Sequence, residues 1–144
     1  MKRLFDIFSA LIGLFFLGPV FLGILIVILA AHGRPVFFKQ YRVGCNGIDF
    51  LLLKFRTMSV QKGAEAGQFD AGDCSRVTSV GKFLRRTKLD ELPQIWNVLK
   101  GEMSVVGPRP EIRKWVEAYP NRWQEILTVR PGITDPASIR FRNE

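Results

Sequence analysis

The chain has 144 residues, of which 47% are hydrophobic, and it carries a formal net charge of +8. A chain of this length is expected to form one domain, and its positive charge indicates an anionic partner such as nucleic acid, lipid headgroups or phosphorylated small molecules. Because Cys45 and Cys74 form no CxxC motif and His32 is the single histidine, the composition argues against a zinc site and favours reduced thiols.

The first predicted element is the uncharged, strongly apolar run from Ile7 to Ala31. As a straight helix this run would be about 37 Å long, which is enough to cross the hydrocarbon core of a bilayer with some tilt. A cleaved signal peptide is not expected, because the run is too long and no small-x-small cleavage site precedes the charged region. The sequence therefore predicts a membrane anchor.

Two features favour an anchor that enters the membrane and returns to the same side. Basic residues flank the run at both ends, so the charge bias of a single crossing is missing. These residues are Lys2 and Arg3 before the run, and Arg34, Lys39 and Arg42 after it. Gly18-Pro19 lies near the middle, where a proline kinks a helix. A re-entrant helix fits both features, and a kinked helix that spans the bilayer is the alternative.

The next segment has the pattern of a β-hairpin. Two β-branched and aromatic runs, Val36–Val43 and Ile48–Arg56, are separated by a turn that contains Asn46-Gly47. Lys54 and Arg56 are two residues apart, so they would share one face of the second strand. Such a pair of cations suits a diphosphate, and a solvated strand face explains it equally well.

The segment from Ser59 to Ser79 is rich in glycine, alanine, serine and aspartate. This composition predicts a loop of the kind that often covers active sites. The alternative is a surface loop that has no role in function.

A helix is predicted to follow the acidic pair Asp90-Glu91. Its apolar residues recur at spacings of three and four, and they are Leu89, Leu92, Trp96 and Leu99. Gly101 is expected to end this helix. Pro93 is tolerated only near a helix start, so Asp90 and Glu91 are expected at or just before the first turn.

The acidic pair has a structural and a chemical interpretation. Carboxylates at a helix start interact well with the helix dipole, and Thr87 with Asp90 fits a capping box. Capping leaves unexplained the three cations just upstream, which are Arg85, Arg86 and Lys88. A helix start that binds an anion does explain them, and a carboxylate beside Mg²⁺ and phosphate is typical of phosphoryl transfer.

The segment from Glu111 to Arg130 is amphipathic, and Pro120 is expected to divide it into two short helices. Its apolar positions, which include Trp115, Tyr119 and Trp123, alternate with charged residues. This pattern predicts helices that lie in the membrane interface, and core-facing helices are the alternative.

Taken together, several stretches resemble the bacterial sugar transferase family, the monotopic phosphoglycosyl transferases that start glycan assembly on a polyprenyl phosphate. The resemblance covers nearly the whole chain, and its most specific part is Leu89–Pro110, which reads LDELPQIWNVLKGEMSVVGPRP. The other matching stretches are Lys2–Asp6, Gly33–Gly44, Lys54–Met58 and Arg130–Thr134.

The resemblance implies a reaction and its site residues. Asp90 would be the nucleophile that attacks the β-phosphate of a UDP-sugar, releasing UMP, and undecaprenyl phosphate would then accept the sugar phosphate. Glu91 would act beside Asp90 and hold Mg²⁺. Arg85 and Arg109 would bind phosphate, together with the pair Lys54 and Arg56.

The resemblance also implies the architecture. We expect an α+β fold, mostly α-helical, with a re-entrant membrane helix over 1–33 and a catalytic domain over 34–144 at the cytosolic face of the bacterial inner membrane. Lys2 and Arg3 would contact lipid headgroups, and Gly18-Pro19 would form the kink, although a serine often precedes this proline in the family. A homodimer is possible, and the sequence does not decide between a monomer and a dimer.

The family continues for a few dozen residues beyond the position of Arg142-Asn143, so we expect this chain to be a truncated or minimal version. The sequence does not identify the sugar that is transferred. One alternative is a non-catalytic, membrane-anchored module that binds lipid or a partner, which leaves Asp90-Glu91 unexplained. A nucleic-acid binder is a weaker alternative, because no helix-turn-helix or RNA-binding motif is present.

Overall fold

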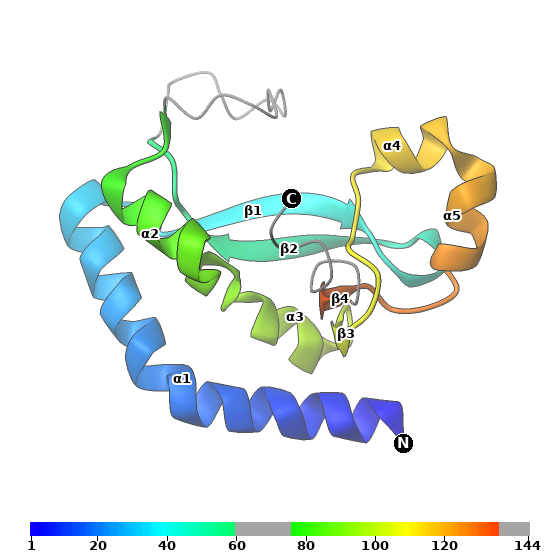
Figure 1. Cartoon of the computed structure of the whole chain (residues 1–144), viewed down its shortest axis with the longest axis horizontal. Coiled ribbons are helices and arrows are strands. Elements are labelled where there is room, and N and C mark those ends of the chain that lie inside the picture. Colours follow the sequence, from blue (N-terminus) through cyan, green and yellow to red (C-terminus); the bar gives the residue numbers. More distant parts are fainter. Residues whose placement is uncertain (60–75, 136–144) are drawn as a thin grey trace.

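The computed structural model describes residues 1–59 and 76–135, and the α+β prediction is confirmed over them: long and short helices surround a β-hairpin (Figure 1). In chain order the elements are α1 (Lys2–His32), β1 (Phe37–Val43), η1 (Cys45–Gly47), β2 (Asp49–Phe55), α2 (Ser79–Thr87), η3 (Leu89–Glu91), α3 (Gln94–Lys100), β3 (Ser104–Val106), α4 (Arg113–Ala118), α5 (Pro120–Ile126) and β4 (Gly132–Thr134).

The first helix is long, apolar and bent. α1 has 31 residues with Pro19 inside it, and its first half runs beneath α3 and β3 while its second half rises beside α2 (Figure 1). Proline lacks the amide donor and crowds the preceding turn, which explains a bend at this point. The re-entrant kink at Gly18-Pro19 and the path through a membrane stay predictions.

Most of the apolar surface of α1 is left uncovered by the rest of the fold. Phe15 and Phe16 are 78% and 71% exposed, and Leu4, Phe8 and Leu22 are also exposed. Within the part of the chain that the structure describes, α1 is the one helix long and apolar enough to cross a membrane. An apolar patch of this size on a soluble protein would aggregate, so it indicates contact with lipid or with another protein.

The predicted hairpin is confirmed. β1 and β2 pair antiparallel in a register that places Phe38 opposite Lys54 and Lys39 opposite Leu53. Asn46 has a φ of 57° and Gly47 a φ of 74°. Both values lie in the left-handed region that asparagine and glycine tolerate, which is why this dipeptide turns the chain here.

The amide of Asn97 joins α3 to the outer edge of β2. Its Oδ1 accepts from the amide of Leu53 at 3.2 Å, and its Nδ2 donates to the carbonyl of Leu51 at 2.8 Å. Nδ2 also donates to Glu102 at 2.6 Å, and the Asn97 side chain is fully buried. The edge groups of β2 are therefore satisfied by a helix in place of a third strand.

Two apolar clusters hold α1 against the hairpin. The first consists of Ala10, Phe50, Leu52, Val98 and Met103. The second consists of Ile24, Ile28, Phe55 and Leu84, with Phe21 and Phe37 packed against it. Each half of α1 contributes to one cluster, so this exposed apolar helix is also part of the core.

The start of α1 is hydrogen-bonded to the last turn of α3 and to β3. Arg3 donates to the carbonyls of Val98 and Leu99 at 2.6 and 2.8 Å, where the last carbonyls of α3 lack intrahelical partners. The buried Asp6 accepts from the hydroxyl of Ser104 at 2.9 Å and from the amide of Val105 at 3.0 Å.

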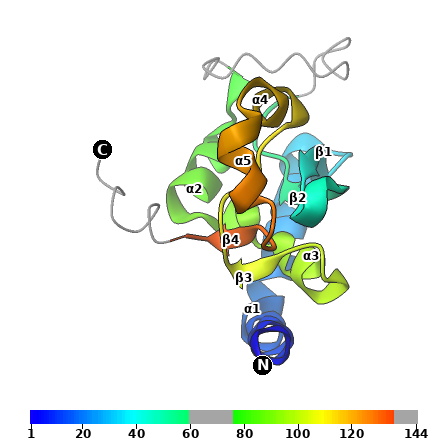
Figure 2. The ribbon, with the colours of Figure 1, turned by 90° about the vertical axis from the view of Figure 1, so that its right-hand side faces the viewer.

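A parallel pairing of β3 with β4 lies beside α3 and was not predicted from the sequence (Figure 2). Gly107 and Gly132 pack backbone to backbone here, and a Cβ at Gly107 would stand 2.5 Å from the carbonyl oxygen of Arg130. Only glycine fits such an approach. The pairing fixes both ends of the Gly-Pro-Arg-Pro loop, because Gly107 donates to Thr134 and Gly132 donates to Pro108.

The predicted division of the amphipathic segment at Pro120 is confirmed, because Pro120 is the first residue of α5. Val116 is buried, whereas Trp115 and Tyr119 are about half exposed. The two helices lie at the far end of the hairpin from the bend of α1 (Figure 1). Their placement in a membrane interface stays a prediction.

We expect Asn97→Leu to destabilise the protein by about 2–4 kcal/mol, because it leaves the amide of Leu53 and the carbonyl of Leu51 buried without partners. The free energy of unfolding in detergent, measured by urea titration, checks this value. The matched control is Asn121→Leu on the exposed surface of α5, where little change is expected. Equal effects of the two substitutions would contradict the role given to Asn97.

Candidate active site

Asp90 and Glu91 lie in η3, the single turn between α2 and α3, as the position of Pro93 predicted. Lys88 adopts a left-handed conformation with a φ of 60°, which ends α2 and redirects the chain into this turn. The predicted capping box is wrong. The hydroxyl of Thr87 donates back to the carbonyls of Phe83 and Leu84, and η3 has no side-chain cap.

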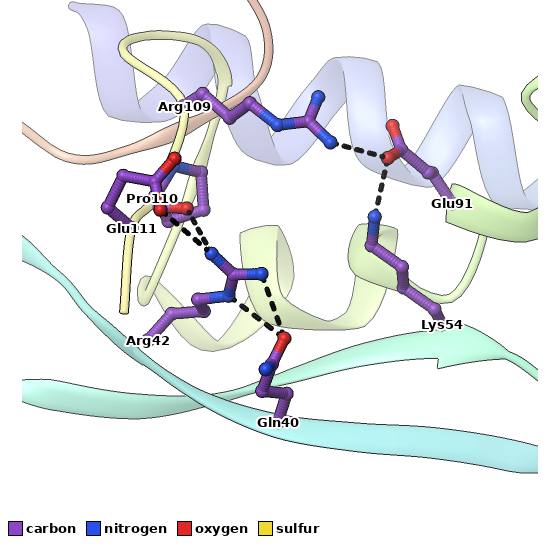
Figure 3. A network of polar contacts seen from close by, with 7 residues as sticks. All are labelled: Gln40, Arg42, Lys54, Glu91, Arg109, Pro110 and Glu111. Carbon is purple, nitrogen blue, oxygen red and sulfur yellow. Dashed lines mark hydrogen bonds and ion pairs between the residues drawn. The ribbon is translucent and has the colours of Figure 1, made fainter. Parts of the chain in front are cut away.

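The carboxylate of Glu91 lies between two cations (Figure 3). Lys54 Nζ is 2.7 Å from Glu91 Oε1, and Arg109 Nη2 is 3.6 Å from the same oxygen. The Lys54 and Glu91 side chains are 20% and 12% exposed, so this pair is largely shielded from water. The structure thus brings three predicted site residues together from β2, η3 and the loop after β3.

A second network, next to the first, holds the loop that carries Arg109 (Figure 3). Arg42 on β1 donates to the carbonyl of Pro110 at 3.2 Å and pairs with Glu111 at 3.3 Å. Its Nε and Nη2 donate to Gln40 Oε1 at 3.2 and 2.8 Å. The guanidinium therefore bridges the hairpin and the Gly-Pro-Arg-Pro loop.

Sequence reasoning missed the roles of Gln40 and Arg42, although a signal was present. In the observed register, Phe38, Gln40 and Arg42 share the face of the hairpin that carries Lys54. Two polar residues alternating on that face marked it as a polar site. Gln94, which is 3% exposed and lines the same small pocket as Glu91 and Arg109, was missed because it reads as an ordinary helix residue.

Asp90 is buried, with 8% of its surface exposed, and its Oδ1 has no hydrogen-bond partner. Burial raises the pKa of this carboxyl above its ordinary value, and the charge of Glu91 adds to the rise, whereas Lys54 opposes it. A poorly solvated carboxylate with a free oxygen is poised to act as a base or a nucleophile.

The remaining predicted phosphate ligands have protein partners in this structure. Arg85 Nε donates to the hydroxyl of Thr57 at 2.9 Å, from the last turn of α2. Arg56 donates to the carbonyl oxygens of His32 and Gly33, at the end of α1. Arg56 therefore binds the helix end, whereas Lys54 binds Glu91. Phosphate binding by Arg56 and by Arg85 stays a prediction.

The membrane-facing predictions also have a structural setting. The guanidinium of Arg3 is occupied by two α3 carbonyls, so a headgroup contact would require it to leave them. Lys2 is exposed at the start of α1. Most of the predicted Ser59–Ser79 loop, including Cys74, lies outside the described residues. Its ends meet where Met58 and Val77 form a β-bridge.

Glu91, the predicted Mg²⁺ ligand, is compatible with one of the modes in which this ion binds. Residues 1–59 and 76–135 contain no group of three or more acidic, histidine or cysteine side chains that would form a cage. Mg²⁺ more often binds one or two carboxylates together with substrate phosphates. The single carboxylate of Glu91 suits that second mode, in which substrate phosphates complete the site.

The sequence matches the bacterial sugar transferase family over residues 1–144. It is 40% identical over 143 residues to an uncharacterised sugar transferase, EpsL, from Bacillus subtilis, covering 99% of this chain and 70% of that protein. It is 42% identical over 149 residues to a UDP-glucose:undecaprenyl-phosphate glucose-1-phosphate transferase from Xanthomonas campestris, covering 99% of this chain and 31% of that one.

A third relative is a UDP-N-acetylgalactosamine-undecaprenyl-phosphate N-acetylgalactosaminephosphotransferase from Aeromonas hydrophila. The two are 39% identical over 142 residues, which cover 96% of this chain and 34% of the relative.

We expect Asp90→Asn to raise the thermal unfolding midpoint at pH 7.5 by about 2–8 °C, the shift that corresponds to roughly 1 kcal/mol. The raised pKa means that charging Asp90 costs stability as the pH rises through the folded-state value. The gain should therefore vanish as the pH falls below the ordinary value of 3.8. Melting curves between pH 3 and pH 8 measure it.

Asp49→Asn is the matched control, because the Asp49 side chain is 40% exposed and pairs with Arg113 on the surface. This control should show no gain at any pH. A gain in Asp90→Asn that is independent of pH, or no gain at all, would contradict the electrostatic cost assigned to Asp90.

Proposed function

Because the chain belongs to the bacterial sugar transferase family and is therefore a transferase, we propose that it transfers a sugar 1-phosphate from a UDP-sugar to undecaprenyl phosphate. Two relatives that match nearly the whole length of this chain carry names that describe this reaction, which supports the proposal. The observation that carries the proposal is the buried Asp90, whose Oδ1 has no hydrogen-bond partner and whose carboxyl feels the charges of Lys54 and Glu91.

In the first step, Asp90 Oδ1 attacks the β-phosphorus of the UDP-sugar. A phosphorus–oxygen bond forms to the carboxylate, and the bond from that phosphorus to the bridging oxygen breaks. UMP leaves with the bond's electron pair, and the sugar phosphate stays on Asp90 as an acyl phosphate. Burial keeps water away from the carboxylate, which favours attack on phosphorus and protects the intermediate from hydrolysis.

In the second step, a phosphate oxygen of undecaprenyl phosphate attacks the same phosphorus. The acyl phosphate bond breaks, Asp90 is restored as a carboxylate, and a polyprenyl diphosphate sugar is released. Splitting the transfer in this way lets the soluble donor and the membrane-bound acceptor bind in turn at one carboxylate.

Lys54 and Arg109 would bind the donor diphosphate. Arg109 makes the longer ion pair with Glu91, at 3.6 Å, and its side chain is 55% exposed, so it can also contact a bound substrate. Arg42 and Gln40 would act as positioning residues that hold the loop carrying Arg109. A clamp of fixed cations stabilises the charge that develops on the leaving UMP.

We propose Mg²⁺ as the cofactor, held by Glu91 and the donor phosphates. When bound, it would neutralise charge on the diphosphate. Glu91 already faces two cations, so the negative charge of the substrate is needed to balance a third positive group beside it.

We also propose that the protein lies on the cytosolic face of the bacterial inner membrane. Residues 1–33 would dip into it as a re-entrant helix, and 34–144 would form the catalytic part. The bend of α1, its exposed apolar side chains and the basic residues at both ends support this placement. The half-exposed Trp115 and Tyr119 suit α4 and α5 in the interface.

Asp90→Asn should lower UMP release by a factor on the order of 10³ or more, because removal of a nucleophile leaves only binding and electrostatic effects. UMP is measured with purified protein, Mg²⁺, undecaprenyl phosphate and a panel of UDP-sugars. Glu125→Gln, on the exposed face of α5, is the matched control and should retain activity. No UMP from the unsubstituted protein, or unchanged release by Asp90→Asn, would sink the proposal.

The re-entrant path has a separate test. In a background with Cys45→Ser and Cys74→Ser, a cysteine is placed at Lys2 or at Arg34 and labelled from outside intact cells. Both positions should stay unlabelled until the inner membrane is permeabilised. Labelling of one position alone in intact cells would mean that α1 spans the membrane.

A further inference from the structure

An apolar groove of about 450 Å³ lies between the bent α1, the hairpin and α3. Its volume is in the range of sites that hold small lipophilic molecules, about 300–1,000 Å³. α1 contributes Leu14 and Phe21, and α3 contributes Ile95, Trp96 and Leu99. The site chemistry described above makes no use of this groove.

The groove and the polar pocket around Glu91 lie on opposite faces of β2. Leu51 and Leu53 line the groove, whereas Leu52 and Lys54 line the polar pocket. This division follows from the alternation of side chains along a strand. α3 lies between the two openings, fastened to the edge of β2 by Asn97. A ligand in the groove is therefore separate from the nucleotide.

Two lysines add positive charge to the otherwise apolar lining. Lys39, opposite Leu53 in the hairpin, and Lys100, the last residue of α3, both line the groove and are exposed. Among the residues that the structure describes, neither lysine forms an ion pair. An apolar cavity with two free cations is complementary to a molecule with a hydrocarbon chain and an anionic head.

We propose that the groove holds one acyl chain of an anionic bilayer phospholipid, such as phosphatidylglycerol, with the head phosphate at Lys39 and Lys100. The inference rests on the membrane placement proposed above. Asp90 lies in η3 and Lys100 ends α3, and at the rise of a helix the ten-residue separation between them corresponds to about 15 Å. A phosphate held there is a lipid anchor point and is too far away to react.

Trp96 is a reporter for this site, because it lines the groove and is 54% exposed. The chain has three tryptophans, so Trp115→Phe with Trp123→Phe leaves Trp96 alone. This variant is placed in phosphatidylcholine nanodiscs that contain phosphatidylglycerol or phosphatidylcholine with brominated acyl chains, at equal mole fractions. Bromine quenches tryptophan at contact. Quenching by brominated phosphatidylglycerol should be stronger by about threefold or more, the scale expected for lysines near anionic lipid.

The variant Lys39→Gln/Lys100→Gln should reduce this quenching to the level of brominated phosphatidylcholine. The matched control is Lys82→Gln/Lys114→Gln, which removes the same charge from exposed positions on α2 and α4 and should keep the preference. Equal quenching by the two lipids, or an equal effect of the two lysine pairs, would overturn the proposal. Relief of quenching by one undecaprenyl phosphate per chain would assign the groove to the acceptor and would also overturn it.

UMP release from the unsubstituted protein, measured in the same nanodiscs, tests the proposed function separately. Lipid preference without UMP release would contradict the catalytic proposal and leave the lipid site standing. UMP release without lipid preference would contradict the lipid site and leave the catalytic proposal standing.

Discussion

The rest of the structure depends on the contact between the Asn97 amide and the edge of β2. This contact sets the helix that follows Asp90 and Glu91 against the strand that carries Lys54. Without it, the edge of a two-stranded hairpin would be open to water or to other chains. Because the amide both donates and accepts, it fixes the register between helix and strand, and an apolar contact alone would let α3 slide. The 2.7 Å pair of Lys54 and Glu91 is a consequence of that register.

The boundary between α3 and β2 also separates a polar pocket from an apolar groove. On one side of β2, Leu52 and Lys54 line the polar pocket that contains Glu91, and on the other side Leu51 and Leu53 line the apolar groove beside α1. A single strand can border both sites, because its neighbouring side chains point to opposite sides. The polar side includes the buried Asp90 with an unsatisfied oxygen, an arrangement that costs stability. Such costs are typical of functional sites and are offset here by the two apolar clusters.

Local sequence signals predicted much of this arrangement. Asn46-Gly47 predicted the hairpin, and Pro93 with Gly101 predicted where the helix after Asp90-Glu91 begins and ends. The pairing of β3 with β4 was out of reach, because three-residue strands far apart in the chain have no periodicity of their own and are formed by tertiary contacts. The capping box at Thr87 was wrong because the hydroxyl bonds to its own helix. The contact of Arg3 with the carbonyls of α3 was likewise not predicted, because that helix is distant in sequence; the headgroup contact assigned to Arg3 stays a prediction.

The fastening of the first turn of α1 has a consequence for how the protein can be divided. Arg3 and Asp6 bind residues that follow Asn97 in the chain, and both halves of α1 supply side chains to the core. α1 is therefore not an interchangeable apolar helix. A fusion that replaced it with another hydrophobic helix of equal length would remove the side chains that bind the end of α3 and β3. α1 and the rest of the fold must be expressed and engineered as a single unit.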